Sequence, residues 1–101
     1  MITWHRIEET SEGLNEIQVG GKKICIAVKN REVFACSRIC PHAGGALSSG
    51  YIDAMGNIVC PVHHYRFSLK NGRNTSGEGY HLKTYPVEIR EDGIYVGITS
   101  V

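Results

Sequence analysis

Cys40-Pro41-His42 and Cys60-Pro61-Val62-His63 begin and end the stretch of sequence that decides the fold of this chain. Seventeen residues separate His42 from Cys60. Each end contributes one thiol and one imidazole, and both groups are ligands for iron and zinc in proteins. The spacing predicts two short loops that share one metal centre, with Cys40, His42, Cys60 and His63 as its ligands.

Two kinds of metal centre fit these four ligands. A [2Fe-2S] cluster uses them if one iron binds both sulfurs and the other binds both nitrogens. A single zinc ion would be held in a tetrahedron and would be structural and redox-silent. Zinc modules more often pair like ligands in tight knuckles, so one cysteine and one histidine in each loop favour the cluster.

Length and composition limit what this centre can belong to. The chain has 101 residues, enough for one domain with its own core but too few for a second catalytic module. Its formal net charge is +1 and 21% of its residues are charged, which argues against nucleic acid or an anionic membrane as a partner. The first thirty residues contain four glutamates and no apolar run longer than Ile24–Val28. We therefore expect neither a signal peptide nor a membrane span, and a cytoplasmic protein.

Most of the remaining sequence has the pattern of short strands. Polar and apolar residues alternate with a period of two, and pairs such as Gly20-Gly21, Asn71-Gly72 and Asp92-Gly93 predict tight turns. The expected strands cover residues 3–7, 15–19, 24–28, 33–36, 51–53, 57–59, 67–69 and both sides of Asp92-Gly93. Seven to ten short strands without a long amphipathic helix predict an all-β fold, an antiparallel β-sandwich or barrel.

Two further cysteines, Cys25 and Cys36, lie in apolar strand-like runs. An even number of cysteines would suggest disulfides in a secreted chain, but no secretory signal supports that here. We expect both residues to be small buried hydrophobes, with a redox or ligand role as the alternative.

The ligand loops also carry a family resemblance. Residues 40–47 (Cys-Pro-His-Ala-Gly-Gly-Ala-Leu), Gly50 and residues 60–67 (Cys-Pro-Val-His-His-Tyr-Arg-Phe) resemble the two cluster-binding loops of small Rieske ferredoxins. The resemblance implies a single Rieske domain over residues 1–101, in which residues 37–76 form a small cluster-binding subdomain at one tip. It also implies one [2Fe-2S] cluster per chain, bound by the four ligands above.

The same resemblance implies a function. Soluble ferredoxins of this kind are electron carriers rather than enzymes, and we expect a monomer. The implied partners are a flavin-dependent reductase, which supplies electrons, and a terminal oxygenase, which accepts them. Two alternatives stay open, namely the small subunit of an assimilatory reductase such as nitrite reductase, and a redox-sensing binding module.

Departures from the high-potential members of the family suggest a low-potential centre. Those proteins brace the two loops with a disulfide, at positions where this chain has Gly45 and Val62. They also place serine and tyrosine hydroxyls near the cluster, where this chain has Tyr65 and Phe67. Because fewer donors to the sulfurs weaken the affinity for an electron, we expect a midpoint in the lower part of the Rieske range of about −150 to +300 mV.

Two more positions depart from the usual pattern of the family. His64 follows the second histidine ligand, where glycine is usual. A positive φ at that position would be tolerated by histidine, at some cost in energy. Residues 75–80 replace a proline-containing stretch that normally shields the cluster.

The resemblance also suggests where partners dock. Ligand histidines of the family face solvent, so His42 and His63 should lie on the docking face. Residues 37–77 contain four cations and one acid, namely Arg38, Arg66, Lys70 and Arg73 against Asp53. We expect a positive tip and acidic partner surfaces, with Arg66 supporting either the loop or the partner. Apolar docking through Ala46, Leu47 and Tyr65 is the alternative.

Overall fold

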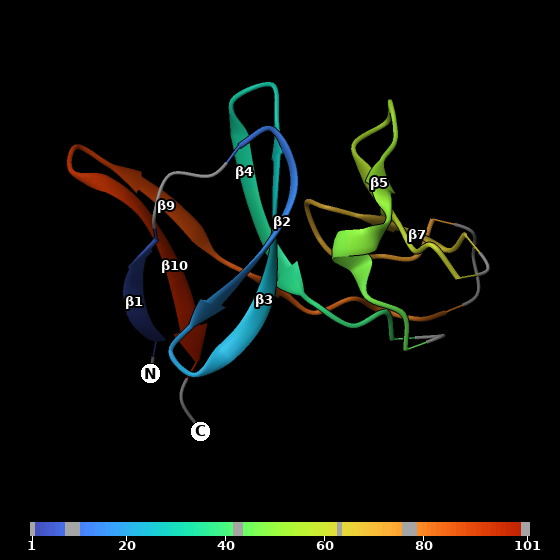
Figure 1. Ribbon diagram of the computed structural model, residues 1–101, viewed down its shortest axis with the longest axis horizontal. Coiled ribbons are helices and arrows are strands. Elements are labelled where there is room, and N and C mark those ends of the chain that lie inside the picture. The colour runs from blue at the N-terminus through green and yellow to red at the C-terminus, as the bar shows by residue number, and fades with distance from the viewer. Residues whose placement is uncertain (1, 8–10, 42–43, 63, 76–78, 100–101) are drawn as a thin grey trace.

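The computed structural model describes residues 2–7, 11–41, 44–62, 64–75 and 79–99 (Figure 1). These residues form ten strands and one turn of 3-10 helix. All the paired strands are antiparallel, which confirms the predicted all-β fold. The elements are β1 (Ile2–Ile7), β2 (Gly13–Val19), β3 (Lys22–Lys29), β4 (Glu32–Ser37), η1 (Leu47–Ser49), β5 (Tyr51–Ile52), β6 (Asn57–Val59), β7 (Arg66–Ser68), β8 (Thr84–Tyr85), β9 (Val87–Arg90) and β10 (Gly93–Thr99).

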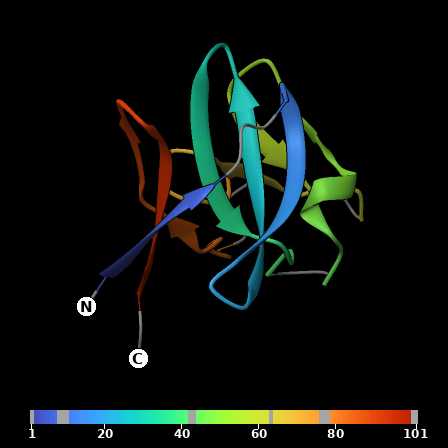
Figure 2. The same cartoon turned by 60° about the vertical axis from the view of Figure 1, so that its left-hand side comes forward.

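The strands form three sheets that lie side by side (Figures 1 and 2). Within the sheets the strand orders are β1-β10-β9, β2-β3-β4-β8 and β5-β6-β7. The three sheets follow one another in this order from left to right in Figure 1. The first two sheets make the sandwich that the sequence predicts. The third sheet is a separate small layer, and the two cysteines of the predicted metal centre lie on its side of the molecule.

The middle sheet is buried on both faces, which explains the unbroken apolar run in β3. Ile24 and Ile26 pack toward the first sheet, in a core that includes Val96 and Ile98. Cys25 and Ala27 point the other way, because successive side chains of a strand alternate between faces. All four residues from Ile24 to Ala27 are at most 1% exposed. A strand buried on both faces carries a continuous hydrophobic run instead of an alternating one.

The second core lies between the middle sheet and the third sheet. Its buried members are Cys25, Ala27, Cys36, Cys40, Leu47, Ile58, Cys60, Phe67, Leu69 and Leu82. All four cysteines of the chain therefore belong to one cluster of buried side chains. Cys25 and Cys36 lie directly opposite each other on β3 and β4, and both are 0% exposed. Their expected burial as small hydrophobic residues is confirmed.

Two tight turns fix the register of the middle sheet. Gly20-Gly21 joins β2 to β3 with φ values of 55° and 83°, and Asn30-Arg31 joins β3 to β4 with φ values of 51° and 68°. Two consecutive positive φ values are the signature of the type I′ hairpin turn. Because side chains alternate with a period of two, a slip by one residue would exchange the two buried faces of β3.

Two of the predicted hairpins differ in detail from the expectation. The β9–β10 hairpin turns at residues 91 and 92, and Gly93 already pairs with Arg90, so the predicted turn lay one residue too late. At Asn71-Gly72 the chain does turn, and the amide of Gly72 bonds the Ser68 carbonyl at 2.8 Å. The returning segment then makes isolated bridges where a second strand was expected. None of the described segments is a helix long and apolar enough to cross a membrane.

Candidate metal centre

The two loops of the predicted centre are built alike. In the first loop (residues 40–45) the amide of Cys40 donates to the carbonyl of Gly45 at 2.9 Å. In the second loop (residues 60–65) the amide of Cys60 donates to the carbonyl of Tyr65, also at 2.9 Å. Each loop is thus closed by a hydrogen bond from the amide of its cysteine to the carbonyl of the residue five positions later. Both cysteine side chains lie in one buried cluster.

A left-handed residue precedes the end of each loop. Gly44 has a φ of 71° and His64 a φ of 55°, and each is the fourth residue after its cysteine. Position 64 therefore has the positive φ that we considered for it from the sequence. Glycine meets this requirement without strain in the first loop, whereas His64 meets it at a cost in the second.

The strands deliver the two cysteines from different layers. Cys40 follows β4, and the first loop is closed below it by the amide of Leu47, which donates to the carbonyl of Arg38 at 2.8 Å. Cys60 directly follows β6 of the third sheet. Gly50 lets the two segments approach, because a Cβ there would lie 1.9 Å from the Val59 carbonyl oxygen. No other residue fits at Gly50 without moving the backbone that leads to Cys60.

The two thiols lie close together and away from water. Cys40 is 1% exposed and Cys60 is 0% exposed, and their side chains are within hydrogen-bonding reach of each other. Burial raises the pKa of the Cys60 thiol, and the neighbouring Cys40 adds to the rise. The backbone N–H of Val62 donates to the Cys60 sulfur and acts in the opposite direction. Metal binding requires the thiolate, so a bound metal would replace the thiol protons.

The two loops touch each other beside these sulfurs. A Cβ built on Gly45 would lie 2.9 Å from Cγ2 of Val62 and 3.3 Å from Sγ of Cys60. The hydrogen of Gly45 is thus what lets the first loop rest against the second. Gly45 and Val62 are also the two positions at which the high-potential members of the resembling family carry their disulfide.

Two of the four predicted ligands, His42 and His63, lie outside the described residues. Within the part of the chain that the structure describes, no three or more His, Cys, Asp or Glu side chains are grouped to hold a metal ion. The structure therefore brings together the sulfur half of the predicted ligand set. The histidine half stays a prediction from the sequence.

Aromatic side chains cover the described surroundings of the cysteines. Phe67 is 0% exposed and lies within the buried cluster that contains Cys40 and Cys60. Tyr65 packs against the same cluster, and its ring centroid lies 5.8 Å from that of Tyr80. Tyr80 belongs to the stretch that replaces the shielding proline segment, of which residues 76–78 lie outside the described residues.

Two of the four cations expected to make a positive tip are paired with carboxylates. Arg38 Nε lies 2.9 Å from Oε1 of Glu16, and Arg66 Nε lies 3.3 Å from Oδ2 of Asp53. Arg66 thus supports its own loop region, one of the two roles considered for it. Lys70 lines a cleft of about 300 Å³ with Phe34 and Met55, on the side of the β3–β4 hairpin. It faces that hairpin and not the cysteine loops.

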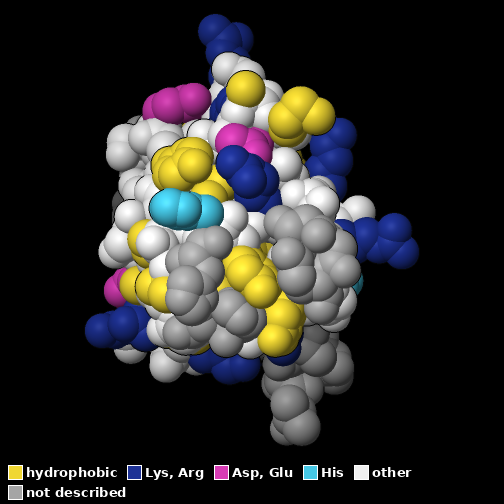
Figure 3. Space-filling view, turned by 90° about the vertical axis from the view of Figure 1, so that its right-hand side faces the viewer, with side chains coloured by type: hydrophobic (Ala, Val, Ile, Leu, Met, Phe, Trp, Pro, Cys, Tyr) yellow, Lys and Arg dark blue, Asp and Glu magenta, His cyan; other side chains and the backbone are white. Residues whose placement is uncertain are grey.

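Several exposed hydrophobic side chains lie on the described surface around the loops. Ile39, Val62 and Tyr80 are between 38% and 40% exposed, and Tyr51 is 50% exposed. Figure 3 shows this end of the molecule face on, with hydrophobic side chains gathered on it and most Lys and Arg toward its edges. Leu47, named in the apolar alternative for docking, is 0% exposed and so does not offer a surface contact. The reason is that its side chain fills the core beneath the first loop.

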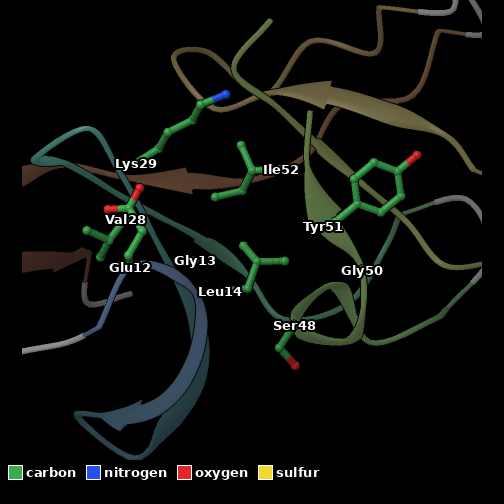
Figure 4. Close-up of a pocket in the computed structure, with 9 residues that line it drawn as sticks. All are labelled: Glu12, Gly13, Leu14, Val28, Lys29, Ser48, Gly50, Tyr51 and Ile52. Carbon is green, nitrogen blue, oxygen red and sulfur yellow. The ribbon is translucent and has the colours of Figure 1, made fainter. Parts of the chain in front are cut away.

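An open cleft of about 390 Å³ lies between the sandwich and the third layer (Figure 4). Leu14 and Ile52 form part of its apolar wall, and Glu12, Lys29 and Ser48 are among its polar residues. Neither Cys40 nor Cys60 lines it. The cleft is therefore separate from the candidate metal centre.

Comparisons with known proteins agree with this geometry. A family profile described as Rieske [2Fe-2S] domain matches residues 3–86. The 3-phenylpropionate/cinnamic acid dioxygenase ferredoxin subunit of Photorhabdus laumondii is 32% identical over 70 residues, which cover 68% of this chain and 67% of that protein. The solved ferredoxin of carbazole 1,9a-dioxygenase from Nocardioides aromaticivorans IC177 has a TM-score of 0.82 and 26% identity, over 93% of this chain and 96% of that one.

The same fold occurs in another class of protein. A Mycobacterium tuberculosis protein assigned as a small subunit of NADH-dependent nitrite reductase has a TM-score of 0.87, over 100% of this chain and 99% of that one. Its sequence identity is only 19%, so this likeness concerns the fold alone.

Proposed function

Because this chain belongs to the Rieske [2Fe-2S] domain family, we propose that it is an electron carrier that receives single electrons from a flavin-dependent reductase and passes them to a terminal oxygenase. The observation that carries the proposal is the pair of like-built loops, which brings the buried thiols of Cys40 and Cys60 together. In this proposal the chain acts as a monomer with one cluster and catalyses no reaction by itself.

The ligand set follows from the fit between these residues and the cluster. Cys40 and Cys60 would bind one iron as thiolates, and His42 and His63 would bind the other through neutral imidazoles. The described half fits, because the two sulfurs are adjacent and surrounded by apolar side chains. Residues 37–76 form the cluster-binding subdomain in this proposal. Bound there, the cluster supplies one-electron redox chemistry.

The protein's own residues set the conditions for that chemistry. The Val62 amide donates to the Cys60 sulfur, and such donors favour the more negative, reduced state. Phe67 adds no hydroxyl at a position where the high-potential proteins have one. The sulfur environment therefore has few donors among the described residues, which supports a midpoint in the lower part of the Rieske range.

Docking at the loop end is proposed to be mainly apolar. Ile39, Val62 and Tyr80 offer exposed hydrophobic area there, whereas Arg38 and Arg66 are already bonded to carboxylates. A partner surface with an apolar centre fits this face better than a strongly acidic one does.

A small subunit of a nitrite reductase is the second candidate function, supported by the fold likeness to the Mycobacterium tuberculosis protein. The ferredoxins of dioxygenase systems have both the fold and the higher sequence identity, so they favour the oxygenase as acceptor. The two functions differ in their electron acceptor and can be separated by assay.

The test begins with the purified protein. We expect a red-brown solution, two irons per chain, and a Rieske-type electron paramagnetic resonance signal after reduction. Cys40→Ser and Cys60→Ser should each abolish this signal and leave most of the β-scaffold folded, because the sandwich core lies outside the loops. A colourless protein with stoichiometric zinc would overturn the proposal.

The acceptor is then identified by stopped-flow kinetics. The reduced protein is mixed with a purified terminal oxygenase of a ring-hydroxylating system and, separately, with a nitrite reductase catalytic subunit. Fast oxidation by the oxygenase alone supports the proposed function. Fast oxidation by the nitrite reductase alone supports the second candidate and contradicts the first.

A further inference from the structure

One carboxylate oxygen accepts hydrogen bonds from both chain segments that flank the first loop, which we call its legs. Oε1 of Glu16 accepts a hydrogen bond from Nε of Arg38 at 2.9 Å and another from Oγ of Ser48 at 3.0 Å. Arg38 lies two residues before Cys40, and Ser48 follows the loop on η1. Glu16 lies on β2, in the middle sheet. The side chain thus connects the sandwich to the two chain segments that flank the first loop.

The two legs are also paired with each other below Cys40. The amide of Leu47 donates to the carbonyl of Arg38 at 2.8 Å, and Ile39 forms a bridge with Ala46. The two legs therefore form one unit. This unit can move relative to the middle sheet only if its hydrogen bonds to Glu16 break and its packing against the core is disrupted.

The register of the middle sheet explains why Glu16 can reach this unit. Glu16 pairs with Cys25 across β2 and β3, and Cys25 pairs with Cys36 across β3 and β4. Directly opposed residues point to the same face of a sheet. Cys40 and Cys60 pack against that face. Glu16 therefore lies at one end of the row Glu16, Cys25 and Cys36, which supports the two cysteines of the proposed centre.

We propose that Glu16 is a positioning residue for the iron–sulfur centre, because it fixes the legs of the first loop, and with them Cys40, against the middle sheet. This inference rests on the proposed function. Glu16 acts through Arg38 and Ser48 and is not itself a ligand. The Arg38 and Glu16 side chains are 37% and 31% exposed, so solvent screens the pair and its contribution to global stability is small. Its effect is expected on local opening of the loop.

The chain offers a matched control for this carboxylate. Glu88 Oε1 lies 2.9 Å from Nε of Arg90, the same atoms at the same distance, and those side chains are 51% and 38% exposed. Both residues lie on β9 of the first sheet, on the other side of the sandwich from the loops. A general effect of losing an exposed ion pair should therefore appear equally in Glu16→Gln and Glu88→Gln.

The experiment compares cluster retention in the purified proteins. Visible absorbance is followed after an iron chelator is added at neutral pH. We expect Glu16→Gln to lose its cluster several times faster than the unmodified protein, and Glu16→Ala faster still, because alanine removes both bonds whereas glutamine keeps an acceptor for Ser48. Their paramagnetic resonance signals should also differ from that of the unmodified protein. Glu88→Gln should match the unmodified protein in both respects, and equal rates in all four proteins would overturn the inference.

A second comparison tests the shared oxygen itself. If Arg38 and Ser48 act through Glu16, adding Arg38→Gln to Glu16→Ala should not speed cluster loss further, since the bond is already gone. A rate increase in Arg38→Gln that is repeated in full in the double variant would mean that Arg38 acts independently of Glu16, and would contradict the inference.

Amide hydrogen exchange separates this inference from the proposed function. The Leu47 amide, which closes the two legs, should exchange several times faster in Glu16→Gln than in Glu88→Gln, and this can be measured whether or not iron is bound. A purified protein without an iron–sulfur signal would defeat the proposed function, while the exchange comparison would still decide the role of Glu16. A protein that holds its cluster equally well with and without Glu16 would defeat the inference alone.

Discussion

His64 carries backbone strain in the second loop. Its φ of 55° lies in the left-handed region, which costs a residue with a side chain about 1–2 kcal/mol. Glycine avoids that cost but loses about 0.5–1 kcal/mol through greater freedom in the unfolded chain. His64→Gly should therefore stabilise the protein by up to about 1 kcal/mol and keep the cluster.

Denaturant unfolding and iron content measure this prediction. Arg31→Gly is the matched control, because Arg31 has a φ of 68° in the β3–β4 turn and lies away from the loops. Similar stabilisation in both variants would identify backbone strain as the cause. Loss of iron from His64→Gly would show that the imidazole of His64 has a role at the centre.

Gly45 and Val62 are close enough to be joined covalently. A Cβ on Gly45 would lie 3.5 Å from Cβ of Val62, at the short end of the range for disulfides. The double variant Gly45→Cys with Val62→Cys should form a disulfide on oxidation and slow the loss of iron from the centre. The single variant Gly45→Cys should be less stable than the unmodified protein, since its Cβ would lie only 2.9 Å from Cγ2 of Val62.

Thiol titration and peptide mass mapping test the link. Free thiols at both positions after oxidation of a folded double variant would mean that the loops lie farther apart in solution than this geometry requires.

Strand β3 shows how one element serves two cores. Its side chains alternate between the first core and the one that contains Cys40 and Cys60, so Cys25 and Cys36 lie in the same cluster as these two cysteines without being ligands in the proposed site. Cys25→Ala and Cys36→Ala should each cost about 1 kcal/mol of stability, because each removes a buried sulfur, and both should retain two irons per chain. Urea unfolding and iron analysis provide the measurement. Loss of iron from either variant, at unchanged folding, would contradict this division of roles.

The β5–β6 hairpin depends on an ionised carboxylate. Burial tends to raise the pKa of Asp53, but hydrogen bonds from Asn57 and Met55 and the charge of Arg66 outweigh it, so the pKa lies below its ordinary value. A folded-state pKa that is lowered contributes stability above the unfolded pKa, and this stability is lost as pH falls through the folded pKa. The free energy of unfolding should thus decrease as the pH falls below about 4, the ordinary pKa of an aspartate.

Unfolding in urea at several pH values tests this effect. Asp53→Asn should flatten the acid dependence, and Asn57→Ala, which removes one donor but keeps the carboxylate, should move it to higher pH. An acid dependence that is unchanged in Asp53→Asn would contradict the assignment.

Local signals in the sequence predicted most of the elements. The alternation and the turn signals located β2, β3 and β4 and the turns between them within one or two residues, but β8, the short edge strand of the middle sheet, was not predicted. The three-layer arrangement was harder to predict, because a continuous run such as Ile24–Ala27 indicates burial without saying what covers each face. The motifs singled out Cys40 and Cys60, which the structure places in one buried cluster, and their role as ligands stays a prediction. Glu16 was not predictable, since its bonds to Arg38 and Ser48 join positions 22 and 32 residues away.

At the scale of the whole molecule, the distribution of charge differs from what a count of residues suggests. Four cations against one acid predicted a positive tip, but two of the cations are bonded to carboxylates, one of which comes from β2, outside the counted stretch. Electron transfer to the oxygenase should therefore depend only weakly on salt. Ile39→Ser should slow it about fivefold or more, since an apolar contact at the centre of an interface contributes about 1 kcal/mol or more.

Stopped-flow rates over a salt series test this prediction. Ile89→Ser is the control, because Ile89 is 63% exposed on β9 of the first sheet, away from the loops. Arg38→Glu would not be a clean probe of docking, since it would also break the bond to Glu16. A steep fall in rate with salt, together with an unchanged rate in Ile39→Ser, would show that charge governs recognition after all.

The pairing of β1 with β10 has a consequence for synthesis on the ribosome. Ile2 lies opposite Thr99, so β1 finds its partner strand only when almost all of the described chain has been made. The hairpins of β2, β3 and β4 and both cysteine loops are joined by contacts between nearby residues, and they are complete much earlier. The nascent chain can therefore present Cys40 and Cys60 to the machinery that delivers iron and sulfide before the first sheet has closed.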